Sequence, residues 1–91
     1  MRVSKDFIMR EIAGEFILVP TGAAAAKFNG FITMNEVGKF IFQTLAEEHT
    51  AQEVAARITE EYSVDAGTAL TDLEEFLQQL RQIGALVEDA G

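Results

Sequence analysis

The fold is decided by the stretch Phe28-Asn29-Gly30-Phe31-Ile32-Thr33-Met34-Asn35-Glu36-Val37-Gly38-Lys39-Phe40-Ile41-Phe42. Within this stretch, the four residues that follow Gly30 predict a short apolar strand over Phe31–Met34. Asn35 can then cap a helix by accepting a hydrogen bond from a free backbone N–H of its first turn. Gly38 inside this helix costs about 1 kcal/mol relative to alanine, which suggests that a neighbouring backbone packs closely there. The buried positions of the predicted helix recur at helical spacing: Val37, Phe40, Ile41 and Leu45. Phe42 lies off this stripe, so we expect two sides of the helix to be buried.

Two further strands are predicted on the N-terminal side of this stretch. Phe7–Ile12 and Glu15–Val19 are separated by Ala13-Gly14, a spacing that favours a tight hairpin. The second run is apolar without alternation, which indicates a central strand covered on both faces and ended by Pro20. Residues 21–27 are expected to form a connecting loop, although their four alanines could instead start a helix.

Two more helices are predicted on the C-terminal side. Thr50 and Glu53 form a capping box that opens a helix ending near Tyr62. Asp65 caps the longest helix, which runs to about Ile83 and stops at Gly84 in a left-handed conformation. The apolar side of the second helix consists of Val54, Ala55, Ile58 and Tyr62, and that of the longest helix of Ala66, Ala69, Leu70, Leu73, Phe76, Leu77, Leu80 and Ile83. The latter stripe spans about 140°, wider than one contact in a small domain usually requires.

Together these elements predict an α+β fold. We expect a winged-helix-like domain with a three-stranded antiparallel sheet followed by three helices. A chain of 91 residues fits one domain, here residues 1–91. The tail Ala85–Val87 could add a short closing strand.

Composition excludes several function classes. The net charge is -8, with seven basic and fifteen acidic residues, so we expect neither nucleic acid nor an anionic membrane as a partner. The chain has no cysteine, which excludes disulfides and thiolate chemistry. The start of the chain, Met1–Asp6, lacks the apolar stretch of a signal peptide, and we expect a cytoplasmic protein.

Catalysis has little support in the sequence. His49 is the single histidine, and without a second His or a Cys it completes no metal site. The neighbouring acid pairs diverge by about 100° on a helix, which does not suit a general acid and base acting on one atom. They are Glu47-Glu48, Glu60-Glu61 and Glu74-Glu75. We therefore expect no enzyme activity, no metal and no cofactor.

DNA recognition is the next hypothesis, because the short turn Ser63-Val64 between two helices beside a hairpin is typical of winged-helix proteins. The last helix would then enter the major groove. Its outward positions carry three acids and one base, which would repel phosphates. They are Asp72, Glu74, Glu75, Gln78, Gln79, Arg81 and Gln82.

The stretch 28–42 resembles the signature of the PqqD family, the pyrroloquinoline quinone biosynthesis protein D group. The shared pattern is a glycine, a short strand, Asn-Glu-x-Gly and an apolar helix. The segment Glu60–Asp65, followed by Asp72–Leu77 and Gly84, is similar to the second half of that family. The resemblance covers about residues 7–88. One departure is Phe42, where the family commonly has tryptophan; phenylalanine keeps the packing role.

The resemblance implies a RiPP recognition element, a non-catalytic domain that binds the leader of a ribosomally made precursor peptide. Such domains present the leader to a modifying enzyme, often a radical SAM protein, and the peptide is added as a strand beside the third strand and the third helix. The implied contact residues are Phe31, Ile32, Thr33, Met34, Ala69, Asp72, Leu73, Phe76, Gln79 and Leu80. The resemblance settles neither the precursor and enzyme partner nor whether the pathway makes the quinone.

Two features of the residues themselves fit this mechanism. A short third strand can leave one row of N–H and C=O groups unpaired, and the wide apolar stripe offers more surface than a small core requires. Both features are also compatible with a domain that binds no peptide: the whole stripe can be core, and the edge can be covered by a homodimer, by domain swapping or by the tail. A generic protein-interaction module and, less so, a nucleic-acid-binding regulator remain as alternative functions.

Two hypotheses name the groups that would hold the peptide. Phe76 and Leu73 would form the floor, so that Leu73→Lys weakens binding while the helical signal survives. Asp72 and Glu75 would pair with basic leader residues, which predicts salt-sensitive binding.

Overall fold

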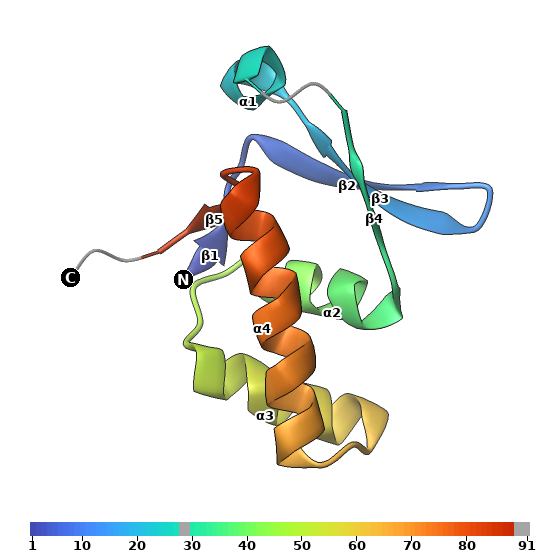
Figure 1. The fold of residues 1–91 in the computed structure, drawn as a ribbon, viewed down its shortest axis with the longest axis vertical. Coiled ribbons are helices and arrows are strands. Elements are labelled where there is room, and N and C mark those ends of the chain that lie inside the picture. Colours follow the sequence, from blue (N-terminus) through green and yellow to red (C-terminus); the bar gives the residue numbers. More distant parts are fainter. Residues whose placement is uncertain (28–29, 89–91) are drawn as a thin grey trace.

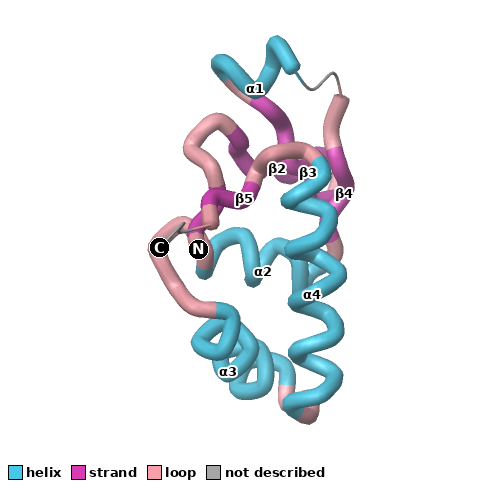
Figure 2. Tube along the Cα trace, turned by 60° about the vertical axis from the view of Figure 1, so that its left-hand side comes forward, coloured by secondary structure: helices cyan, strands magenta, loops and turns pink. Residues whose placement is uncertain are grey.

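The computed structural model describes residues 1–27 and 30–88. In chain order the elements are β1 (Arg2–Val3), β2 (Phe7–Ile12), β3 (Glu15–Pro20), α1 (Gly22–Lys27), β4 (Ile32–Met34), α2 (Glu36–Thr44), α3 (Ala51–Tyr62), α4 (Ala66–Gln82) and β5 (Leu86–Val87). Strands β2, β3 and β4 form an antiparallel sheet in that order, and α2, α3 and α4 lie to one side of it (Figures 1 and 2). This α+β arrangement confirms the predicted fold class. The predicted β4 begins one residue later than expected, at Ile32.

The sheet has one face toward the helices and one face away from them. Leu18 of β3 is fully buried in the core, and Ile17, which points the opposite way, is 9% exposed. Ile17 is flanked by its cross-strand partners Arg10 and Thr33. The central position of β3 and the burial of adjacent residues on both faces therefore confirm the interpretation of its unbroken apolar run. Phe28 and Asn29, which begin the diagnostic stretch, lie outside the described residues.

The alanine-rich segment was predicted as a loop, and this prediction is wrong. Gly22–Lys27 forms the short helix α1. Its start is held by the Thr21 carbonyl, which accepts hydrogen bonds from the N–H groups of Ala24 and Ala25 at 3.1 and 3.4 Å. Alanine has the highest helix propensity, and Thr21, which immediately precedes the helix, is of a residue type favoured at that position. The alternative of a helix at the alanines was the right one.

The three longer helices begin at the residues predicted to cap them. Asn35 accepts a hydrogen bond from the Gly38 N–H at 2.8 Å, and Asp65 accepts one from the Thr68 N–H at 2.7 Å. The capping box of α3 is complete, because Thr50 and Glu53 each accept the other's backbone N–H. These caps fix where each helix starts and hence which residues face the sheet.

The core lies between the sheet and the helices. It is formed by the buried residues Val3, Phe7, Leu18, Met34, Ile41, Phe42, Leu45, Val54, Ile58, Ala69, Leu73, Phe76, Leu77, Leu80 and Ala85. Ile41 and Phe42 are adjacent and both buried, which confirms that α2 is covered on two sides. No helix among the described residues is long and apolar enough to cross a membrane.

The C-terminal segment pairs away from the main sheet. Strand β5 confirms the predicted closing strand, and its partner is β1, which the sequence analysis did not predict. Both lie beside the C-terminal end of α4 (Figure 1). The tail is held there by a salt bridge of 2.9 Å between Arg81 and Glu88. The alternative in which the tail covers β4 is therefore wrong, and among the described residues β4 pairs with β3 alone.

Candidate functional site

Strand β4 is one of the two edges of the main sheet, and among the described residues it pairs with β3 alone. Ala13 and Gly14, with φ of 53° and 83°, form a two-residue turn that closes on the pair Ile12↔Glu15. In such a hairpin the closing pair exchanges both hydrogen bonds, and bonding then alternates along the strand. Phe16 and Leu18 consequently direct their backbone groups toward β4. Their register partners are Met34 and Ile32, so the intervening Thr33 directs its N–H and C=O away from the sheet.

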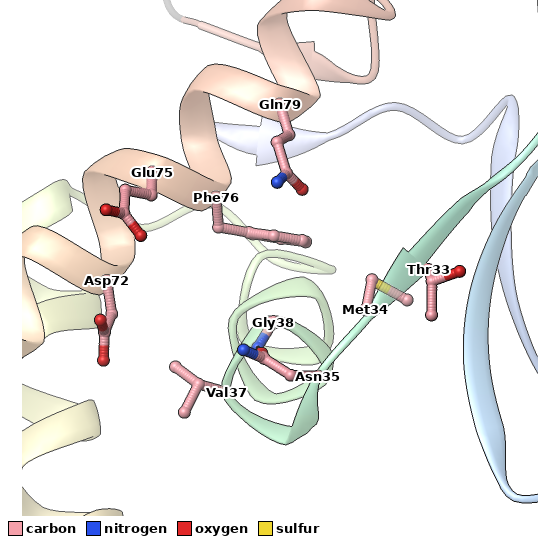
Figure 3. Close-up of a pocket in the computed structure, with 9 residues that line it drawn as sticks. All are labelled: Thr33, Met34, Asn35, Val37, Gly38, Asp72, Glu75, Phe76 and Gln79. Atoms are coloured by element: carbon pink, nitrogen blue, oxygen red, sulfur yellow. Dashed lines mark hydrogen bonds between the residues drawn. The ribbon is translucent and has the colours of Figure 1, made fainter.

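A groove lies between this edge and helix α4. Its volume is about 120 Å³. It is lined by Thr33, Met34, Asn35, Val37, Gly38, Asp72, Glu75, Phe76 and Gln79. Figure 3 shows that these side chains come from three elements, β4 with the turn after it, the first turn of α2, and the middle of α4.

The floor of the groove is apolar. Phe76 is 7% exposed and Met34 is 4% exposed, so most of each side chain packs into the core beneath. The Phe76 ring extends from α4 toward α2 (Figure 3). A Cβ at Gly38 would lie 3.1 Å from Cε1 of Phe76. Gly38 therefore admits a neighbouring side chain, and the prediction that a backbone packs against it is wrong.

The rim of the groove is polar and acidic. Asp72 and Glu75 lie one turn apart on α4, with Asp72 half-buried and Glu75 exposed. Gln79 lies one turn further on, and Asn35 lies on the opposite side, where Thr33 borders the groove with its backbone. None of the described residues that line the groove is a lysine or an arginine. A ligand would thus meet hydrogen-bonding groups and negative charge above an apolar floor.

The ten predicted contact residues divide into three groups. Thr33, Met34, Asp72, Phe76 and Gln79 come together at the groove. Ala69, Leu73 and Leu80 have no exposed surface, because they pack within the core.

The remaining two predicted residues, Phe31 and Ile32, lie along the edge; Phe31 is 62% exposed and Ile32 is half-buried. The wide stripe on α4 is therefore mostly core, since of its large residues Leu70 alone, at 46%, is strongly exposed. Full burial also removes the basis for expecting Leu73→Lys to leave the fold intact.

Four lining residues were absent from the predicted contact set: Asn35, Val37, Gly38 and Glu75. Glu75 was predicted to pair with basic leader residues, although it was not in the predicted contact set. For Asn35, Val37 and Gly38 the sequence did hold a signal, which was Gly38 itself. A glycine in the first turn of an apolar helix indicates that another part of the chain comes close to that helix. That approach places the start of α2 in the groove.

The fold and the groove define a class: a small α+β domain of winged-helix-like order, with a sheet edge that no other described segment pairs with and an apolar floor beside it. Comparison with known families identifies it further. Residues 11–86 match the family described as Coenzyme PQQ synthesis protein D (PqqD), and the chain belongs to this family. A search of curated proteins finds no match.

Two solved structures are similar over essentially the whole chain. One is described as TbiB1 in complex with the TbiA(beta) leader peptide; it is 27% identical, with a TM-score of 0.75, and 100% of each chain is covered. The other is a lasso peptide synthetase B1 complexed with the leader peptide, 20% identical, with a TM-score of 0.72 and 96% of each chain covered. The second supports the fold alone.

Proposed function

We propose that this domain is a RiPP recognition element, which binds the leader of a precursor peptide as an added strand beside β4. The observation that carries the proposal is the unpaired edge at Thr33 directly above the Phe76 floor. An extended peptide there can satisfy the free backbone groups and also bury side chains in the groove. The family and the TbiB1 complex support this function.

Both parts of the site are required by the energetics. Strand β4 has three residues, so it offers only a few backbone hydrogen bonds, each contributing about 0.5–1.5 kcal/mol net. Micromolar affinity requires about 8 kcal/mol after the costs of association and of ordering the peptide. Apolar leader side chains must supply the rest, at about 1.5–3 kcal/mol for each one fully buried. The groove beside Phe76 and Met34 is the place for them.

The contact surface is therefore narrower than the sequence predicted. The peptide contacts Phe31, Ile32 and Thr33 along the edge and the groove-lining residues on α4. Ala69, Leu73 and Leu80 are fully buried, so in this proposal they anchor α4 to the core and do not contact the peptide.

The domain serves a partner enzyme and carries out no reaction of its own in this proposal. The enzyme, a radical SAM or another modifying protein, would act on the core of the precursor while the domain holds the leader. A cytoplasmic setting fits a chain without cysteine. Whether the product is the quinone or another modified peptide depends on the precursor.

The test is an NMR titration of the labelled domain with the precursor peptide encoded beside its gene. We expect shifts at residues 31–38 and along the groove side of α4, with micromolar affinity. Gly38→Leu should abolish them, because the new side chain would displace Phe76 or fill the groove. Gly67→Leu is the matched control, since Gly67 is an exposed helical glycine on the first turn of α4.

Two results would count against the proposal. Shifts confined to another surface would place the binding site elsewhere. A concentration-dependent change at β4 without any peptide would favour the alternative, in which two copies of the domain pair through this edge.

A further inference from the structure

The acidic rim formed by Asp72 and Glu75 takes part in no salt bridge in the described part of the chain. In residues 1–27 and 30–88 the ion pairs are Met1 with Glu48, His49 with Glu53, and Arg81 with Glu88. Asp72 and Glu75 take part in none of them. The nearby base of α2, Lys39, is occupied elsewhere, because its Nζ lies 4.2 Å from the centre of the Phe16 ring.

The carboxylates of Asp72 and Glu75 border the same part of the groove. Positions i and i+3 of a helix share a face, with Cβ atoms about 5–6 Å apart, and like charges at this spacing repel. Both residues line the groove, on the side of Phe76 away from Gln79 (Figure 3). The net charge of -8 leaves little positive field to offset them. A bound cationic side chain would relieve this repulsion.

The register of an added strand decides which peptide residues meet this rim. The residue paired with Thr33 has its side chain on the same face as that of Thr33, away from the helices. The residues before and after it point to the groove, and groove-facing side chains are about 7 Å apart. A residue beside Met34 would lie above Phe76. The next groove-facing position, past Met34, would lie toward the end of the groove that Val37, Asp72 and Glu75 line (Figure 3).

We propose that the leader recognised by this domain carries a lysine or arginine two residues from an apolar anchor, with the apolar side chain above Phe76 and the cation between Asp72 and Glu75. This inference rests on the proposed function and adds the charge of the ligand. The groove volume of about 120 Å³ suits one apolar side chain of moderate size, since a cavity of about 150 Å³ holds benzene. A long basic side chain spans the remaining distance to the carboxylates.

The experiment selects binders from a displayed library of random short peptides on three versions of the full chain. They are the unaltered protein, the double variant Asp72→Asn/Glu75→Gln, and the control Glu74→Gln, whose residue is exposed on α4 and does not line the groove. We expect the unaltered protein and the control to enrich an apolar residue with a base two positions away. The double variant should keep the apolar preference and lose the basic one.

A synthetic peptide taken from the selection then measures how much the basic residue contributes to affinity. Replacing its base with glutamine should weaken binding to the unaltered protein about fivefold at low salt and much less at high salt. The same replacement should leave binding to the double variant unchanged.

The outcomes separate this inference from the proposed function. Groove-binding peptides without a basic preference, or with one that survives in the double variant, would overturn the charge assignment and leave the proposed function standing. Selected peptides that cause no NMR shifts at β4 or the groove would overturn both.

Discussion

The two edges of the main sheet both present outward backbone N–H and C=O groups, but different side chains surround them. By the alternation set at the hairpin, Glu11 of β2 and Thr33 of β4 both direct N–H and C=O away from β3. The edge at β2 carries the exposed charged residues Arg10 and Glu11, which discourage pairing. The edge at β4 lies beside the groove floored by Phe76. Both edges offer unpaired backbone groups, so the proposed site depends on the adjacent apolar floor as well.

The largest expected effect is on the free energy of unfolding, and it comes from disrupting the core that α4 forms with its neighbours. Leu73 has no exposed surface, so Leu73→Lys would place a charge in the core and should lower the free energy of unfolding by at least about 3 kcal/mol. Far-UV circular dichroism during urea unfolding measures this. The matched control is Leu70→Lys on the same helix, where 46% exposure lets the ammonium reach water and little change is expected. Equal stability of the two variants would contradict the position assigned to Leu73.

The second prediction compares the two edges directly. Thr33→Pro removes one outward N–H from β4 and adds a ring that obstructs an incoming strand, without removing a hydrogen bond to β3. We expect peptide affinity to fall about tenfold or more, from the lost hydrogen bond and the obstruction together. Glu11→Pro makes the same change at the β2 edge and should leave affinity unaltered. Calorimetric titration of both variants with the same leader peptide gives the comparison.

A reversed result would be informative about the site itself. If Glu11→Pro weakened binding and Thr33→Pro did not, the peptide would be pairing with β2. Both variants must first show the unaltered far-UV spectrum, since each position belongs to an edge strand where proline is tolerated.

The smallest expected effect is on the pH dependence of stability, and it concerns the residues that cap α3 and α4. The pKa of Asp65 is lowered, chiefly because its carboxylate accepts the Thr68 N–H, and that of Glu53 is lowered chiefly by the Thr50 N–H. A pKa lower in the folded than in the unfolded state gives stability above the ordinary values of 3.8 and 4.5, which is lost as the pH falls through the folded values.

This loss can be measured as a fall in the urea midpoint between neutral pH and about pH 3. Asp65→Asn keeps a side chain that caps helices well and removes the titrating group. Its midpoint should therefore fall less steeply with acid than that of the unaltered protein. An identical slope would show that the Asp65 carboxylate contributes nothing to the acid response.

Local chemistry allowed much of this fold to be predicted. The caps at Asn35, Thr50 and Asp65 depend on side chains within three residues of the N–H groups they satisfy, so the sequence alone locates them. The hairpin at Ala13-Gly14 is local in the same sense. Strand β1 was missed because two residues have no periodicity, and its pairing with β5 joins opposite ends of the described chain.

The site was predicted less well, for a different reason. Periodicity identifies the apolar side of α4, but how much of that side neighbouring elements cover depends on contacts distant in sequence. Helix α4 packs against α2, α3 and β5. These neighbours bury Ala69, Leu73 and Leu80 completely and leave Phe76 at the groove. The position of Phe76 depends on Gly38, a contact between residues far apart in the chain.

The shortness of β4 has a consequence for the timing of peptide release. Three residues limit the number of backbone bonds that must break together, so they favour a complex of only micromolar affinity. At an association rate constant of about 10⁶ M⁻¹ s⁻¹, such a complex dissociates in about one second. A longer β4 would hold the leader for much longer. With such a complex, the proposed recognition element would exchange one precursor for the next on the timescale of a typical enzyme turnover.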